Sequence, residues 1–107
     1  MRYLFAVLDD RTNSATPGEA KAINVFNDKL EAAGHRIIAA GLVAPEEGRR
    51  VDNRNGIGAV ETGTSLSTEL YMSGFWIIDA PDDHAAEALA LEASLACNRR
   101  IDVRRFL

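Results

Sequence analysis

The stretch that most constrains the fold is residues 73–79, which read SGFWIID and hold the only tryptophan of the chain. Aromatic and β-branched residues at consecutive positions are typical of a β-strand. Successive side chains of a strand point to opposite faces, so a strand that is apolar at odd and even positions must be covered on both faces. The rest of the chain therefore has to cover both sides of this strand.

Three other segments have strand patterns. Residues 3–8 (YLFAVL) and residues 36–43 (RIIAAGLV) are apolar at both parities, like residues 73–79. Residues 101–106 alternate apolar with charged side chains, which is typical of a strand with one exposed face. We therefore expect these segments to form one sheet together with residues 73–79.

Two segments have helical signals. Residues 17–33 follow Thr16, a suitable N-cap, start with a proline and stop before Gly34. The second helix starts at Asp82 and Asp83, which favour the positive end of the helix dipole, and runs to Cys97. Its expected packing residues are Leu89, Leu91 and Leu95.

The middle of the chain predicts an exposed hairpin. Residues 49–54 and 57–62 flank Asn55-Gly56, and this dipeptide suits a tight turn that needs positive φ at both residues. Residues 63–72 are rich in hydroxyl side chains and are expected to form a loop.

The order of these elements predicts a fold class. Strand, helix, strand in residues 2–43 is repeated in residues 73–106, with the hairpin between them. Two such halves build an α+β, ferredoxin-like βαββαβ sandwich. Right-handed crossovers then place both helices on one face of the antiparallel sheet. We expect a single domain over residues 1–107.

The second face of this sheet predicts self-association. Two helices cover one face only, and the apolar residues on the other face would form a patch that soluble monomers rarely expose. We therefore expect a homodimer that packs through the open sheet faces.

Composition excludes several classes of protein. The net charge of -4 argues against nucleic-acid binding, which needs a basic face. The single cysteine, Cys97, makes no intramolecular disulfide, and the apolar runs are too short to span a membrane. We expect a cytoplasmic protein with no membrane segment and no cofactor. The two histidines lie far apart in sequence and predict no zinc site.

Several patches resemble the YCII-related family, in particular its DGPF-motif branch. Ala33-Gly34 and residues 37–42 resemble the end of the family's first helix and its second strand. Residues 74–79 (GFWIID) and residues 101–104 (IDVR) are similar to two further strands of that family. The resemblance covers nearly the whole chain, and it implies a ferredoxin-like fold that dimerises as an α/β barrel.

The chain departs from that family where its motifs carry chemistry. Residues 62–65 read TGTS in place of Asp-Gly-Pro-Phe. The YCII branch has a helix 1 histidine and a helix 2 aspartate, which are suggested as a catalytic pair. The matching positions here hold Phe26 and either Cys97 or Asn98. The resemblance therefore implies no such pair in this chain.

The candidate site residues are few. His35 follows the first helix, where it either stabilises the helix end or acts as a general base at a cavity mouth. Further candidates for lining a pocket between the sheets, or for ligand contact, are Asp52, Arg54, Glu61, Tyr71, Trp76 and Arg104.

Three functions stay open. The first is a dimeric α/β-barrel domain that binds a small organic molecule or a partner at the inter-sheet cavity, without assigned catalysis. The second is a cofactor-independent isomerase- or oxygenase-like enzyme for a small aromatic or lactone substrate. The third, implied by the resemblance alone, is a transcription-associated regulatory module. An acid or base in the cavity with a shifted pKa would favour the enzyme.

Overall fold

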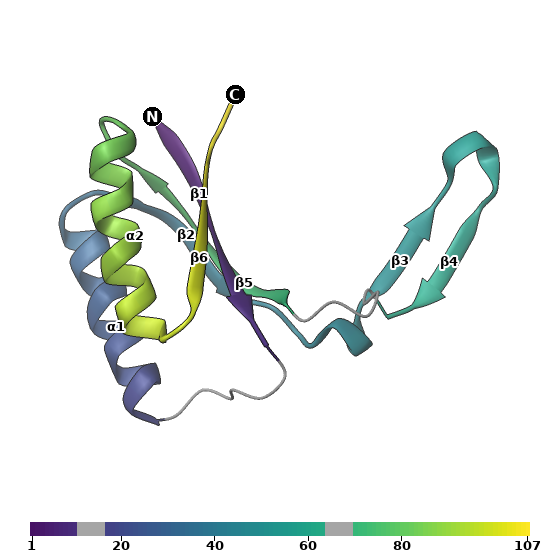
Figure 1. The fold of residues 1–107 in the computed structure, drawn as a ribbon, viewed down its shortest axis with the longest axis horizontal. Coiled ribbons are helices and arrows are strands. Elements are labelled where there is room, and N and C mark those ends of the chain that lie inside the picture. Colours follow the sequence, from purple (N-terminus) through teal and green to yellow (C-terminus); the bar gives the residue numbers. More distant parts are fainter. Residues whose placement is uncertain (11–16, 64–69) are drawn as a thin grey trace.

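The computed structural model describes residues 1–10, 17–63 and 70–107. Figure 1 shows its elements, which are, in chain order, β1 (Arg2–Asp9), α1 (Pro17–Ala32), β2 (Arg36–Gly41), β3 (Arg49–Asp52), β4 (Ala59–Thr62), β5 (Tyr71–Asp79), α2 (Asp83–Cys97) and β6 (Arg100–Arg105). The expected loop over residues 63–72 is therefore wrong at its end, where Tyr71 and Met72 already belong to β5. Residues 64–69 of that loop, and Thr16, lie outside the described residues.

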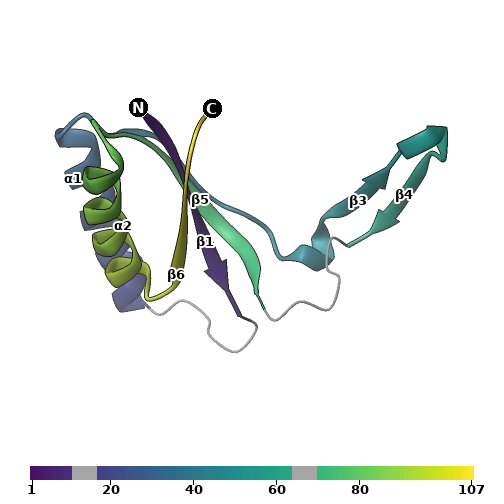
Figure 2. The same ribbon diagram turned by 45° about the horizontal axis from the view of Figure 1, so that its top comes forward.

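The main sheet has four antiparallel strands in the order β2-β5-β1-β6. Both helices lie on one side of this sheet in the two views of Figures 1 and 2. The α+β class with two helices and an antiparallel sheet is confirmed, and the arrangement is compatible with a ferredoxin-like fold. No helix in the described ranges is long and apolar enough to span a membrane.

The core lies between the sheet and the helices. Its buried residues from β1 and β5 are Tyr3, Phe5, Val7, Trp76 and Ile78, and those from the helices are Phe26, Leu30, Ala86, Ala90, Ala93 and Cys97. The Trp76 ring meets the Phe26 ring edge-on at 5.5 Å between centroids. Trp76 Nε1 also donates a hydrogen bond to Asn27 Oδ1 at 2.7 Å. This strand and α1 are therefore joined by ring packing and by a polar contact.

The helix ends follow the sequence signals. Gly34 has a φ of 74°, and the amides of Gly34 and His35 donate to the carbonyls of Glu31 and Leu30, which is the Schellman pattern. At the start of α2, the Asp82 side chain accepts a hydrogen bond from the Ala85 amide at 2.8 Å.

The expected packing surface of α2 is wrong in part. Leu91 and Leu95 are 73% and 85% exposed. The face toward the core carries Ala86, Ala90 and Ala93 instead, at the i, i+4 and i+7 positions. Successive helical residues are rotated by about 100°, so Leu91, next to Ala90, points away from the sheet.

The sheet face opposite the helices is apolar, as the two-sided strands predict. Leu4, Ala6 and Leu8 of β1 pair with Ile77, Phe75 and Met72 of β5, and Ile38 and Ala40 of β2 continue this row. On the other side β6 places Arg100, Asp102 and Arg104 beside it. We refer to this surface as the open face.

The hairpin of β3 and β4 stands apart from the main sheet, on the side opposite the helices in both views (Figures 1 and 2). We call residues 49–62 the arm. Asn55 and Gly56 have positive φ, as predicted, but the connection between the strands is longer than two residues. Arg54–Gly56 form a 3-10 turn, and Gly58 also has positive φ, so the strands are shorter than expected.

Candidate functional site

A cavity of about 490 Å³ lies between α1 and the strands β2 and β5. Helix α1 contributes Glu19, Ile23 and Asn27, which are four residues apart and therefore form one stripe along the helix. The stripe spans about 12 Å, at about 1.5 Å per helical residue. We call this cavity the groove. Its lining from α1, Gly41, Gly74 and Trp76 lies on the helix side of the sheet, and Ala40 and Phe75 of the two strands also line it.

Small residues in the sheet leave room for the groove. Val7 pairs with Gly74 and Gly74 with Gly41, so these three share the face toward the helices. A Cβ on Gly74 would lie 2.8 Å from the carbonyl oxygen of Ala40, closer than real Cβ contacts. A Cβ on Gly41 would meet nothing within 4 Å. The sequence therefore needs glycine at 74 for close strand pairing, and an empty space adjoins position 41.

A buried guanidinium closes one end of the groove. The Arg99 side chain is 7% exposed, and its Nε lies 3.0 Å from Asp9 Oδ1. Its Nη1 lies 3.5 Å from Glu19 Oε2 and donates to the carbonyl of Cys97 at 3.0 Å. Arg99 therefore joins the end of β1, the first turn of α1 and the end of α2.

Two groove residues have clearly shifted pKa values. Burial lowers the pKa of Arg99, but attraction to the carboxylates of Asp9 and Glu19 outweighs this and raises it overall. Burial raises the pKa of the Cys97 thiol. Arg99 therefore stays charged and Cys97 stays a neutral thiol near neutral pH.

One acceptor in this part of the groove is unsatisfied. Asp9 Oδ1 is buried and forms the ion pair with Arg99, but it has no hydrogen-bond partner of good geometry among the described residues. The charged guanidinium of Arg99, 3.0 Å away, is the group that compensates this buried oxygen among the described residues.

The structure brings together two of the residues predicted from the sequence. Tyr71 and Trp76 both line the groove. They do so on the helix side of the sheet, whereas the expected pocket lay between the sheets of two subunits. Asp52, Arg54 and Glu61 lie on the arm, and Arg104 lies on β6 beside the open face.

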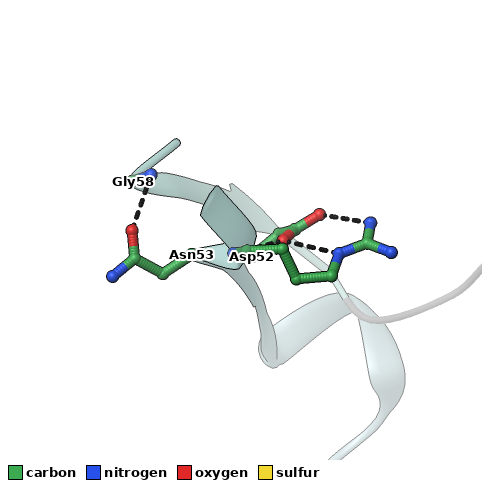
Figure 3. Close-up of polar contacts among 4 residues, drawn as sticks. Asp52, Asn53 and Gly58 are labelled. Atoms are coloured by element: carbon green, nitrogen blue, oxygen red, sulfur yellow. Dashed lines mark hydrogen bonds and ion pairs between the residues drawn. The ribbon is translucent and has the colours of Figure 1, made fainter. Parts of the chain in front are cut away.

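The candidate residues on the arm contact neighbouring residues of the arm and do not line the groove. Arg54 Nε and Nη2 donate to Asp52 Oδ1 and Oδ2 at 3.0 and 2.7 Å, and this contact lowers the pKa of Asp52 (Figure 3). Next to this pair, Asn53 Oδ1 accepts from the Gly58 amide at 2.9 Å. These contacts stabilise the loop between β3 and β4.

His35 lies outside the groove. Its Nδ1 is 2.8 Å from the Asp79 carbonyl oxygen, which can only accept, so this nitrogen carries the proton. The Asp79 amide donates in turn to the His35 carbonyl at 2.8 Å. The histidine therefore ties the end of α1 to the end of β5, which favours the structural interpretation.

Sequence reasoning did not assign Asp9, Glu19 and Arg99 to one site. The signal was present, because Asp9 ends an apolar strand, Glu19 lies in the first turn of α1 and Arg99 follows α2. In the observed topology these three places meet at one end of the sandwich.

The described part of the chain holds no cluster of three or more side chains of the metal-ligating types. No model of a known protein family matches the chain, and no curated protein matches it.

Proposed function

We propose that this protein is a binding domain whose groove receives a small organic molecule. The observation that carries the proposal is the groove itself. Its volume of about 490 Å³ lies within the range of ligand sites, about 300–1,000 Å³. Its walls combine apolar side chains with a few polar groups, which is the usual composition of such sites; Asp9, Glu19 and Arg99 lie at one end, and Asn27 and Arg36 lie elsewhere along the lining.

The lining suggests the chemistry of the ligand. Ile23 and Trp76 offer an apolar wall for a planar or aliphatic body, and Tyr71 adds an aromatic ring. At the other end, the described residues place two carboxylates, Asp9 and Glu19, against the guanidinium of Arg99. A ligand with an apolar body and a hydroxyl, amide or ammonium donor fits both parts.

Binding is favoured over catalysis. A general acid or base works best when its pKa lies near the working pH. The raised pKa values of Cys97 and Arg99 move both groups further from neutrality. The isomerase- or oxygenase-like alternative would need a different group of the groove to act on the substrate, and turnover of aromatic or lactone substrates would favour that alternative.

The test blocks the groove without straining the fold. A library of small organic fragments is screened by NMR against the wild type and against Gly41→Leu, whose side chain would enter the empty space. The proposal expects fragments that shift signals of groove residues in the wild type and bind at least tenfold more weakly to Gly41→Leu.

Gly41→Ala serves as the matched control, since one methyl group occupies little of the groove. Hits that bind Gly41→Leu as well as the wild type would contradict the proposal. So would the absence of any hit that shifts the signals of Tyr71, Trp76 or Asn27.

We also propose that the chain has the ferredoxin-like, YCII-related type of fold and forms a homodimer through its open face. The support is the apolar row of β1, β5 and β2 on the face that neither α1 nor α2 covers. A cytoplasmic location is part of this proposal. A single cysteine, Cys97, cannot form a disulfide within the chain, so the protein would gain no such bond in an oxidising compartment.

Sedimentation equilibrium tests the dimer. Ile38, 45% exposed on the open face, is replaced by lysine, and Leu91 on the outside of α2 is replaced by lysine as the control. We expect a wild-type dimer that Ile38→Lys dissociates and Leu91→Lys does not. A wild type that stays at monomer mass over a wide concentration range would contradict the dimer.

A further inference from the structure

One side of the arm carries an exposed valine pair together with Arg49 and Thr62, and the other side is charged. Val51 and Val60 pair directly across its two strands, and they are 68% and 62% exposed. Arg50 pairs with Glu61 at the neighbouring position, so these charged side chains point to the opposite side. Such alternation is typical of a strand pair with one covered side. In the described structure nothing buries the valines.

The arm is also too small to be stable by itself. A two-stranded hairpin is marginally stable in water, and it needs further strands or a packing surface. The arm has four residues in each strand. It shares no sheet with the other strands among the described residues. A packing surface for the valine side would supply the missing stability.

The position of the arm favours a second copy of this chain as that surface. Figures 1 and 2 show the arm on the side of the sheet that faces away from the helices, which is the side of the open face. A copy that packs on the open face occupies the space beside the arm. In a two-fold dimer the contact is reciprocal, so each arm reaches the other copy.

The area of the open face points the same way. The strands β1, β2, β5 and β6 have 8, 6, 9 and 6 residues. At about 3.3 Å per residue and about 4.8 Å between strands they present about 460 Å² in projection. A stable specific interface buries about 800 Å² on each partner. The open face therefore leaves room for a second contact surface in the interface, and two reciprocal arms provide one.

We propose that the arm is a dimerisation arm, whose Val51–Val60 side packs against a second copy of this chain. The opposite side, with Arg50 and Glu61, takes no part in this contact. This inference rests on the proposed homodimer, and the arm adds to its interface a surface that the strand pattern of the main sheet does not supply.

The test removes the apolar side while keeping the hairpin. Val51→Lys combined with Val60→Glu places opposite charges across the same strand pair, which supports the pairing. The control combines Arg50→Glu with Glu61→Arg on the other side of the arm. Dimer dissociation constants are measured by sedimentation equilibrium, and the thermal midpoint at monomer concentrations checks folding.

We expect the valine variant to raise the dissociation constant at least tenfold and the charge-swapped control to change it less than threefold. The midpoint of the monomer stays the same in the valine variant, since Val51 and Val60 are both exposed. A dimer that resists the valine variant but is dissociated by Ile38→Lys overturns the arm contact and leaves the open-face dimer standing. A monomeric wild type overturns both.

Discussion

Arg99 is the most heavily engaged side chain of the groove end. It is nearly buried and lies against Asp9 and Glu19. Arg99→Met keeps much of the volume but leaves two carboxylates without their cation, and breaking a buried ion pair on one side costs about 3–5 kcal/mol. Urea denaturation measures the loss. Arg2→Met is the control, because Arg2 is half exposed and its ion pair with Asp79 is long, with 3.7 Å between Nε and Oδ1. A loss below about 1 kcal/mol for Arg99→Met would mean that water already solvates these groups.

Trp76 carries packing and a hydrogen bond at once. Trp76→Ala removes a large core side chain and should cost about 3–5 kcal/mol. Trp76→Phe keeps a ring against Phe26 but leaves Asn27 Oδ1 without its donor, and we expect a cost of about 1–3 kcal/mol. Thermal and urea unfolding measure both, with Val25→Ala on the exposed side of α1 as the control. Equal losses for the two Trp76 variants would show that the hydrogen bond, not the ring, dominates.

Tyr3 gives the fold a dependence on alkaline pH. Burial is the largest cause that raises the pKa of Tyr3 from 10.0 to about 12, and the hydrogen bond that Tyr3 donates to Asp83 Oδ1 at 2.7 Å is the second. The folded state thus holds its proton more tightly than the unfolded state. The resulting stability is fully present below pH 10 and is lost as the pH rises toward about 12.

Tyr3→Phe removes that contribution. The free energy of unfolding of the wild type should fall between pH 10 and about 12 more steeply than that of Tyr3→Phe. Chemical denaturation at a series of pH values measures the difference, which cancels the titration of lysines common to both proteins. Parallel curves for the two proteins would contradict the role of the Tyr3–Asp83 contact.

At the scale of elements, two glycines of neighbouring strands should differ in how much stability they lose when replaced by alanine. Gly74→Ala brings a Cβ to 2.8 Å from the Ala40 carbonyl oxygen, so β2 and β5 must shift apart. We expect a loss of about 1–3 kcal/mol in the free energy of unfolding, typical of overpacking. Gly41→Ala meets nothing within 4 Å and should cost less than about 0.5 kcal/mol. A similar loss for both variants would show that the space around each glycine does not determine the cost of the added methyl group.

The elements themselves could be predicted from the sequence because their signals are local. Proline and Gly34 mark α1, Asp82 caps α2, and two-sided apolar runs mark β1 and β5. The side of α2 that packs against the sheet could not be predicted from local signals. Leucine is more hydrophobic than alanine, yet the alanines of α2 face the core. Their small side chains allow the helix to lie close to the sheet.

The candidate site could be predicted only in part for a related reason. Tyr71 and Trp76 stood out by their residue types. The groove depends on which strand neighbours which, and on the absence of side chains at two glycines. In the sequence, nothing distinguishes Arg99 from the arginines at positions 100, 104 and 105. Its burial depends on three elements that are distant in sequence and meet only in the folded sheet.

At the scale of the whole molecule, the two sides of one sheet have different roles. The helix side holds the core and the groove, and the open face and the arm lie on the other side (Figure 1). A ligand and a second copy of the chain would therefore occupy opposite faces of β5, the strand with the only tryptophan. Binding of one does not obstruct the other in this arrangement.

The location of a bound molecule tests this account most directly. A crystal structure of the protein soaked with the tightest-binding fragment of the NMR screen would show on which side of the sheet the fragment lies. We expect the fragment between α1 and β2, with a donor toward Asp9 and its apolar body against Trp76 and Ile23. A fragment held on the open face, between Phe75 and Ile77 of two copies, would contradict it.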